Sequence, residues 1–252
     1  MKIVAINGSH RGERGFTQFL LEKLAVGAYE AGAEVEIVVL ARHQINQCTG
    51  CQICHTDGSY LECVYGDGDD VKSIFDRMRK ADILIFATPV YLFGISSLLK
   101  RFLERINSTG DSDRLRVSKS GLVFHHIDRE LCSKPFALLV TCDNLEDETP
   151  RSVISYFTAY SRFMDAPIVG TLIRKNGVLV GHGKSSELEQ KYPRIQGVYE
   201  AYMQAGRELA TSGRISGKTM WRANRHILDV PLLGLLLKLK PIKGKMIERA
   251  KI

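Results

Sequence analysis

Short apolar runs alternate with amphipathic segments along most of the chain. Five runs are apolar enough to be buried strands, and they span residues 3–6, 34–40, 83–87, 136–141 and 167–173. The strands are separated by helical patterns, which favours a parallel sheet with right-handed crossovers and helices on both faces. We therefore predict an α/β fold built on a doubly wound, five-stranded parallel sheet.

The segments between these runs carry apolar residues at every third or fourth position. This period predicts helices at about 16–31, 71–78, 97–106, 149–164 and 188–211. Asp69 and Asp70 are expected to cap the second helix, and Ser96 or Ser97 to open the third. Residues 107–134 show weak periodicity, so we predict an insertion there with one short element near residue 121.

Three polar loops follow the predicted strands, at 8–17, 88–94 and 141–144. In a parallel sheet they meet outside the carboxyl ends, where such folds bind ligands. The first loop leads into a helix, whose N-terminal amides and dipole favour an anion. Ser9 and Thr17 add hydroxyl donors, and Arg11 or Arg14 can add a charged one. The loop matches neither GxGxxG nor a Walker motif, and we predict a phosphate site. An ordinary turn with surface arginines is the alternative.

Length and charge restrict the class of protein. The chain has 252 residues, enough for one sizeable α/β core with an appendage. No apolar run reaches membrane-spanning length, and the first strand is too short for a signal peptide. We expect a cytoplasmic protein, whose cysteines are thiols or ligands rather than disulfides.

The cysteines of the 47–70 loop form the sharpest motif. Cys48, Cys51 and Cys54 have CxxCxxC spacing, and Cys63 follows after eight residues. Thiolates at this spacing can bind neighbouring irons of one [4Fe–4S] cluster, which a fourth cysteine completes. Zinc sites more often use two separated CxxC pairs. Reduced thiols or a redox-labile disulfide are the alternatives to a cluster.

Two of the loops carry a family resemblance. Ser9, Arg11 and Thr17 match a GSxRxxSxT-type phosphate loop, and residues 88–91 with 98–105 match a TPVYW…LKxFLDR segment. Together they resemble the flavodoxin-like NADPH-dependent FMN reductase family, and more closely its iron–sulfur flavoprotein and multimeric-flavodoxin branch. The resemblance covers about residues 1–173, and implies strand order 2-1-3-4-5. We divide the chain into a flavodoxin-like FMN-binding domain at 1–212, with an insertion at 107–134, and a basic extension at 213–252.

The resemblance implies that the three loops bind FMN. Pro89 stiffens the second loop, Gly94 permits close approach, and the amides between them can reach the pyrimidine edge of the ring. Tyr91 and Phe93 offer aromatic faces. Buried core is the alternative role for this aromatic run. The predicted cofactor-binding residues are Ser9, His10, Arg11, Gly15, Phe16, Thr17, Pro89, Val90, Tyr91, Leu92, Phe93, Gly94, Thr141, Cys142 and Asp143.

The same resemblance implies an oxidoreductase that uses NAD(P)H as co-substrate. The flavin N5 carries the hydride, so no protein side chain is predicted to be catalytic. The acceptor is expected to be a small molecule such as a flavin or quinone. The alternative is an iron–sulfur flavoprotein electron carrier that exchanges single electrons with a ferredoxin-like partner. Either way, the resemblance implies a homodimer or homotetramer.

The basic charge belongs to the C-terminal segment. From Arg214 onward the chain has ten Lys or Arg and two acids, a net charge of +8, so the preceding 213 residues sum to about −1. Residues 226–239 are apolar but are interrupted by Pro231 and Gly234. Such a patch can lie in a membrane interface or attract anionic lipid, and that option stays open. We favour packing of its leucines on this chain or a neighbouring subunit, with solvated lysines around them. These residues are Leu232, Leu233, Leu235 and Leu236, and Lys238, Lys240, Lys243 and Lys245. Nucleic-acid binding is disfavoured, because Trp221 is the single aromatic residue available to stack on bases.

Overall fold

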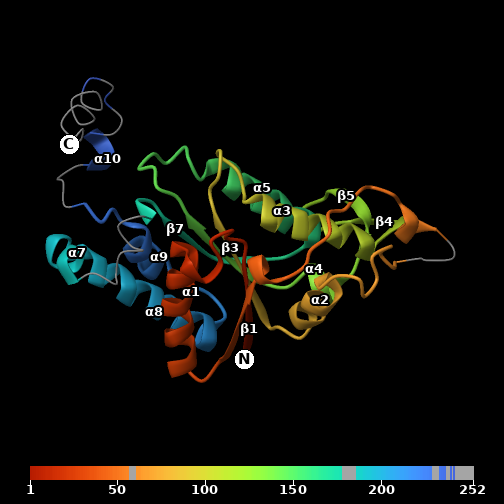
Figure 1. Cartoon of the computed structure of the whole chain (residues 1–252), viewed down its shortest axis with the longest axis horizontal. Helices are drawn as coiled ribbons and strands as arrows, with labels where there is room; N and C mark the ends of the chain where they lie inside the picture. The colour runs from red at the N-terminus through yellow and green to blue at the C-terminus, as the bar shows by residue number, and fades with distance from the viewer. Residues whose placement is uncertain (57–60, 178–185, 229–232, 237–238, 240, 242–252) are drawn as a thin grey trace.

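A parallel sheet lies at the centre of the computed structural model, which describes residues 1–56, 61–177, 186–228, 233–236, 239 and 241 (Figure 1). The strand order is β2-β1-β3-β6-β7, which confirms the predicted order of the five core strands. These strands are β1 (Lys2–Asn7), β2 (Glu34–Val39), β3 (Ile83–Pro89), β6 (Phe136–Thr141) and β7 (Ile168–Arg174).

Helices cover both faces of the sheet and bury one apolar core on each (Figure 1). One layer contains α2 (Val71–Arg79), α3 (Ser97–Glu104) and α5 (Arg151–Met164). The opposite layer contains α1 (Phe16–Glu30), α8 (Arg194–Ser212) and α9 (Gly217–Asn224). Phe86 of β3 stacks on Phe157 of α5 with ring centroids 5.3 Å apart. Strands buried on both faces explain why the central runs are wholly apolar.

The helix ends follow the predicted signals with two differences. Asp69, one residue before the N-cap of α2, accepts from the Val71 amide at 3.1 Å, and Ser96 caps α3 by accepting from the Leu99 amide at 3.2 Å. Asp70 accepts instead from the Gln44 amide at 2.8 Å. The helix predicted over 188–211 is two helices, α7 (Ser186–Lys191) and α8. They separate at Pro193, which has no amide hydrogen to continue a helix.

The predicted insertion holds more structure than one short element. It contains an antiparallel hairpin of β4 (Gly110–Val117) and β5 (Val123–Ile127), followed by α4 (Arg129–Cys132). Asp165, at the end of α5, accepts from Arg116 at 2.7 Å and from the Lys119 amide at 2.8 Å, which fixes the hairpin to the core. β4 is largely exposed and rich in charge, so it lacks the apolar alternation of a half-buried strand.

The remaining elements are short. They are the 3₁₀ turns at Gly12–Arg14, Leu40–Arg42, Ile53–His55 and Arg105–Thr109, and α10 (Leu233–Leu236). In the described ranges no helix combines the length and apolar character that crossing a bilayer requires. Leu232, Lys238, Lys240, Lys243 and Lys245 of the predicted tail patch lie outside those ranges.

The C-terminal segment closes the free edge of β7. The Asn224 side chain accepts from the Ile173 amide at 2.7 Å and donates to the Thr171 carbonyl at 3.0 Å, as a neighbouring strand would. Arg174 is fully buried and donates to the carbonyls of Ala223 and Arg225 at 2.9 and 2.6 Å. The division at residue 212 stays a prediction, but α9 beyond it packs on the sheet.

Close contact between α1 and α8 generates a first testable prediction. A Cβ on Gly206 would overlap the carbonyl oxygen of Leu24, so Gly206→Ala forces the helices apart. We expect it to lower the free energy of unfolding by about 1–3 kcal/mol, measured by urea denaturation. Gly217→Ala is the matched control, because a Cβ there meets open space. Equal stability of the two variants would contradict the prediction.

Candidate functional site

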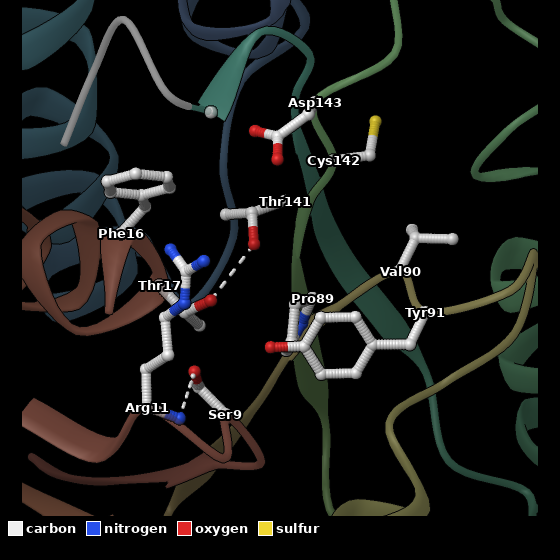
Figure 2. A pocket seen from close by; sticks show the side chains of 11 residues that line it. Ser9, Arg11, Phe16, Thr17, Pro89, Val90, Tyr91, Thr141, Cys142 and Asp143 are labelled. Atoms are coloured by element: carbon white, nitrogen blue, oxygen red, sulfur yellow. Dashed lines mark hydrogen bonds between the residues drawn. The ribbon is translucent and has the colours of Figure 1, made fainter. Parts of the chain in front are cut away.

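A cavity lies at the carboxyl end of the sheet, where the three predicted loops meet (Figure 2). It is bounded by the β1–α1 loop, the end of β3, the end of β6 and the turn after β7. Its lining residues are Ser9, Arg11, Phe16, Thr17, Pro89, Val90, Tyr91, Thr141, Cys142, Asp143 and Gly177. The strand register explains why these loops lie together. Pro89 pairs with Thr141 and Asn7 pairs with Ala87, so β1, β3 and β6 end at the same edge of the sheet.

The first loop is shaped by a buried asparagine. Asn7 accepts from the Ser9 amide at 2.9 Å and donates to Gln18 of α1 at 2.8 Å. A Cβ on Gly8 would lie 2.6 Å from the Cβ of Leu99, so glycine is required where this loop meets α3. The strand end, the loop and the start of α1 are thereby held in one arrangement.

Donors gather on the α1 side of the cavity. The Thr17 and Thr141 hydroxyls are buried and 2.9 Å apart. One donates to the other, so the pair keeps one hydroxyl hydrogen that can point at a ligand. The Arg11 guanidinium lies 5.5 Å from the Phe16 ring centroid, beside Thr17 (Figure 2). An α-helix leaves its first amides without intrahelical acceptors, and α1 begins here at Phe16. The arrangement suits an anion such as a phosphate.

The second loop ends in a tight turn at the rim of the cavity. Tyr91 and Gly94 exchange backbone hydrogen bonds of 3.1 and 3.0 Å, and the residues between them have φ of 44° at Leu92 and 63° at Phe93. Two central residues with positive φ give the mirror image of an ordinary β-turn, and such turns usually contain Asn-Gly. A residue with a Cβ in the left-handed conformation costs roughly 1–2 kcal/mol. Such strain collects at ligand sites.

Hydrogen bonds within the second loop decide which of its backbone amides are left for a bound flavin ring. The Val90 amide donates to the Thr141 carbonyl at 2.8 Å, and the Tyr91 and Gly94 amides are used in the turn. In the described part of the chain, no acceptor contacts the amides of Leu92 and Phe93. These two amides are therefore the ones in this loop that a bound ring can use.

Ten of the predicted cofactor-binding residues line the cavity, and five lie outside its lining. Gly15 is the N-cap of α1, and His10 is exposed with its Nε2 2.9 Å from the Ser97 hydroxyl. Leu92 and Phe93 are 93% and 63% exposed at the tip of the turn. At Gly94, a Cβ would lie 3.8 Å from the Tyr91 carbonyl oxygen, an ordinary contact, so the loop itself does not require glycine there and the predicted approach of FMN stays a prediction.

Two features of the third side were not predicted. Gly177 lines the cavity, and its position after β7 is the signal that would have found it. The Cys142 thiol is directed away from Thr17 and Thr141 (Figure 2). Burial raises the pKa of Cys142 to about 11, while nearby Lys175 lowers it. The thiol is therefore neutral near pH 7 and is no nucleophile there.

All four cysteines of the 47–70 loop line a second cavity, and all are free thiols. Burial raises the pKa of Cys54, and the thiols of Cys63, Cys51 and Cys48 raise it further, so the four side chains lie within electrostatic reach. Across the described residues, no three His, Cys, Asp or Glu side chains are arranged to hold a metal ion. A [4Fe–4S] cluster binds its thiolates on separate irons and so holds them apart. The donor set fits that group, and the ligand assignment remains a proposal.

A buried ion pair fastens this loop to the end of α3. The Arg105 and Asp69 side chains are 3% and 0% exposed and form a salt bridge. Arg105 also donates to the Asn46 carbonyl at 3.0 Å, and its guanidinium lies 4.8 Å from the Tyr65 ring centroid. Arg105 therefore contacts both ends of the cysteine loop, at Asn46 and Asp69, and also the Tyr65 ring near Cys63.

The two cavities have no lining residue in common. Figure 1 shows the described part of the cysteine loop near β4 and β5, at the opposite end of the molecule from α1 and α8. Within this chain the cysteine cavity is therefore separate from the cavity where the three loops meet.

The sheet order and the site at its carboxyl edge define a flavodoxin-like α/β protein. Residues 1–145 match the NADPH-dependent FMN reductase family. The chain therefore belongs to this family of flavin-dependent oxidoreductases, as its loops predicted. In fold, it is similar to an FMN-dependent NADH-azoreductase from Bacillus anthracis in complex with FMN. The TM-score is 0.56 at 14% identity, over 84% of this chain and 100% of that one.

Two curated relatives extend the comparison. An iron-sulfur flavoprotein of Methanocaldococcus jannaschii is 35% identical over 123 residues, which are 49% of this chain and 61% of the relative. A putative NAD(P)H-dependent FMN-containing oxidoreductase of Bacillus subtilis is 38% identical over 109 residues, 43% of this chain and 54% of the relative. The match thus spans between about half and three-fifths of these relatives.

The ion pair predicts how the cysteine loop responds to mutation. Arg105→Met leaves the Asp69 carboxylate buried without its charge partner. It should lower the free energy of unfolding by about 3–5 kcal/mol. Reaction of the buried Cys54 with a thiol reagent should become faster in the same variant. Arg42→Met removes an exposed pair with Glu13 and should cost at most about 1 kcal/mol. If Arg105→Met lowers the free energy of unfolding no more than Arg42→Met does, the ion pair does not stabilise the cysteine loop as predicted.

The strained turn generates a separate prediction. Phe93→Gly removes a left-handed residue with a side chain and should raise the stability of the FMN-free protein by about 1 kcal/mol in urea denaturation. If the Phe93 ring covers the flavin, the same change weakens FMN binding, measured by quenching of flavin fluorescence. A gain in stability with unchanged FMN affinity would remove Phe93 from the predicted contacts.

Proposed function

We propose that this protein passes electrons from NAD(P)H through bound FMN to a small acceptor such as a flavin or a quinone. One observation carries the proposal. The donors of Ser9, Arg11 and Thr17 at the start of α1 face, across one cavity, the proline and aromatic wall of residues 89–91. An anion site beside an apolar wall is what a phosphorylated planar ring requires.

Each side of the cavity has a separate task in holding the cofactor. Ser9, Thr17 and Arg11 would bind the phosphate, while Pro89 and Tyr91 would lie against the ring. Thr141 sets the Thr17 hydroxyl by its 2.9 Å contact. When bound, FMN supplies the hydride and electron chemistry, and the protein positions and tunes it. We assign no catalytic side chain.

The names of the relatives support the cofactor and co-substrate. The Bacillus subtilis relative is named as NAD(P)H-dependent and FMN-containing, and the Bacillus anthracis structure holds FMN. A homodimer or homotetramer stays a prediction, which light scattering on the purified protein measures.

The test is an absorbance spectrum of protein purified without oxygen, followed by NAD(P)H oxidation with menadione or free FMN as acceptor. We expect a flavin spectrum and oxidation that depends on the acceptor. A colourless protein that added FMN cannot reconstitute would refute the flavin site. If the protein binds flavin but oxidises neither NADH nor NADPH, the proposed reductase activity is refuted while the proposed FMN site stands.

The phosphate assignment predicts the effect of a near-isosteric change. Thr17→Val should weaken FMN affinity at least tenfold, because a hydrogen bond to a charged group contributes roughly 1.5–3 kcal/mol. Thr158→Val is the matched control, since the Thr158 hydroxyl is exposed and binds the Ile154 carbonyl of its own helix. Flavin fluorescence titration of the FMN-free proteins measures both. Equal affinities would place the phosphate elsewhere.

A second candidate function rests on the cysteine cavity. If Cys48, Cys51, Cys54 and Cys63 hold a [4Fe–4S] cluster, the protein is an electron carrier that exchanges single electrons with a ferredoxin-like partner. Four free thiols on one cavity, fastened by a buried ion pair, favour this candidate. The name iron-sulfur flavoprotein belongs to the Methanocaldococcus jannaschii relative and supports it.

Iron and sulfide assays on the same anaerobic sample separate the two candidates. Iron and sulfide that are lost in Cys51→Ala but kept in Cys132→Ala would favour the carrier, because Cys132 is buried away from the cavity. Flavin without iron would leave the cysteines as thiols and favour the two-electron reductase.

A further inference from the structure

A further cavity lies between the end of α3, α5, β5 and the start of the cysteine loop. Its volume is about 580 Å³, within the range of roughly 300–1,000 Å³ that small-molecule sites occupy. It has no lining residue in common with the cavity where the three loops meet. The proposed function therefore leaves this space without a role.

Four aromatic side chains line this space, and we call it the aromatic cavity. They are Phe124 and His125 of β5, and Tyr156 and Tyr160 of α5. The Phe124 and His125 rings lie with their centroids 3.9 Å apart and their planes inclined by 33°. Phe124 also packs on Phe163 of α5, with ring centroids 5.4 Å apart. A flat apolar ring can therefore pack against aromatic faces from both elements.

One acceptor and one donor of the aromatic cavity are left for a ligand. Oε1 of Glu104 accepts from Lys100 one turn earlier on α3, and within the described ranges its second oxygen has no hydrogen-bond partner. The Tyr156 hydroxyl has none there either. Burial, together with the charge of Glu104, raises the pKa of Tyr156 to about 12. Tyr156 therefore keeps its hydrogen near pH 7 and can donate it.

The lining of the aromatic cavity does not favour an anion. Among the described residues that line it there is no lysine or arginine. Burial lowers the pKa of His125, and the charges of His55 and Arg116 lower it further, so this imidazole is neutral near pH 7. An anionic ligand would meet the Glu104 carboxylate without a cation on the lining to pair with, which is costly. The ligand is therefore uncharged.

We infer that the aromatic cavity binds an uncharged hydroxyaromatic molecule. Its ring packs on Phe124, and its hydroxyl donates to Glu104 while it accepts from Tyr156. A hydroxyl is the neutral group that donates and accepts through one oxygen, which matches this pair. The site goes beyond the proposed function and does not rest on it.

Other uncharged ligands satisfy the aromatic cavity less well. A quinone can accept from Tyr156 but has no hydrogen for Glu104, and a plain hydrocarbon serves neither group. Each would cover a polar atom without giving it a partner, which costs free energy. Cys48, Thr49 and Gly50 line both this cavity and the cysteine cavity, so the ligand lies directly beside the cysteine loop.

Two naphthalene probes test the inferred ligand class. Isothermal titration calorimetry would measure 2-naphthol and 2-naphthoate with the full-length protein as purified, and again after saturation with FMN. We expect one site for 2-naphthol that FMN does not change, and binding of 2-naphthoate that is about tenfold weaker or more. No binding of 2-naphthol, or binding that FMN abolishes, would overturn the inference. An affinity that falls as the protein concentration rises would assign the cavity to a second copy and would also overturn it.

Variants of the acceptor and the donor provide the matched comparison. Tyr156→Phe should weaken 2-naphthol binding about threefold to tenfold, because one neutral hydrogen bond is lost. Tyr29→Phe is the control, since the Tyr29 hydroxyl donates to the Val35 carbonyl away from the cavity. Glu104→Gln keeps an acceptor but removes the charge, so it should strengthen 2-naphthoate binding about fivefold or more. Equal effects of Tyr156→Phe and Tyr29→Phe, or unchanged discrimination in Glu104→Gln, would refute the assigned contacts.

Discussion

The parallel pairing of β1, β3 and β6 is the constraint on which the site depends. Because parallel strands end at the same edge, three loops from distant parts of the chain open onto one cavity. Pro89 pairs with Thr141 in register, and the loop after β1 lines the same cavity. Any rearrangement of this register would separate the hydroxyl of Thr17 from that of Thr141. The apolar cores on both faces make such a shift costly, since a slip of one residue exchanges the faces of every side chain.

Two further anchors act outside the sheet. Arg105 gathers the ends of the cysteine loop, and Asp165 holds the hairpin through Arg116 and Lys119. Both anchors are charged groups at the ends of helices on the same face of the sheet. On the opposite face, α1 and α8 pack through glycine contacts and apolar side chains, and the exposed Arg207–Glu30 pair also joins these two helices. Charged or polar anchors therefore hold chain segments on both layers, and the buried one lies beside the cysteine loop.

Much of this architecture could be predicted from the sequence because it rests on local patterns. Wholly apolar runs identify β3 and β6, and a serine or aspartate marks the start of α3 and α2. The hairpin was missed because β4 is exposed, so its charges hide the two-residue period. Gly177 belongs to no binding motif, and only its position after the last strand of the predicted order places it at the cavity. The left-handed Leu92 and Phe93 contradict the turn preference of their residue types, and tertiary context overrides that preference.

The closure of β7 by Asn224 has a consequence for how the chain is made. β7 ends at Arg174, but its free edge is covered by a side chain fifty residues later. During synthesis the strand therefore leaves the ribosome well before its cover, with unpaired amides and carbonyls open to another strand. A nascent chain that is stalled or cleaved between Arg174 and Asn224 would present an unpaired strand edge to which another strand can hydrogen-bond. The C-terminal segment thus determines when the sheet is protected from aggregation.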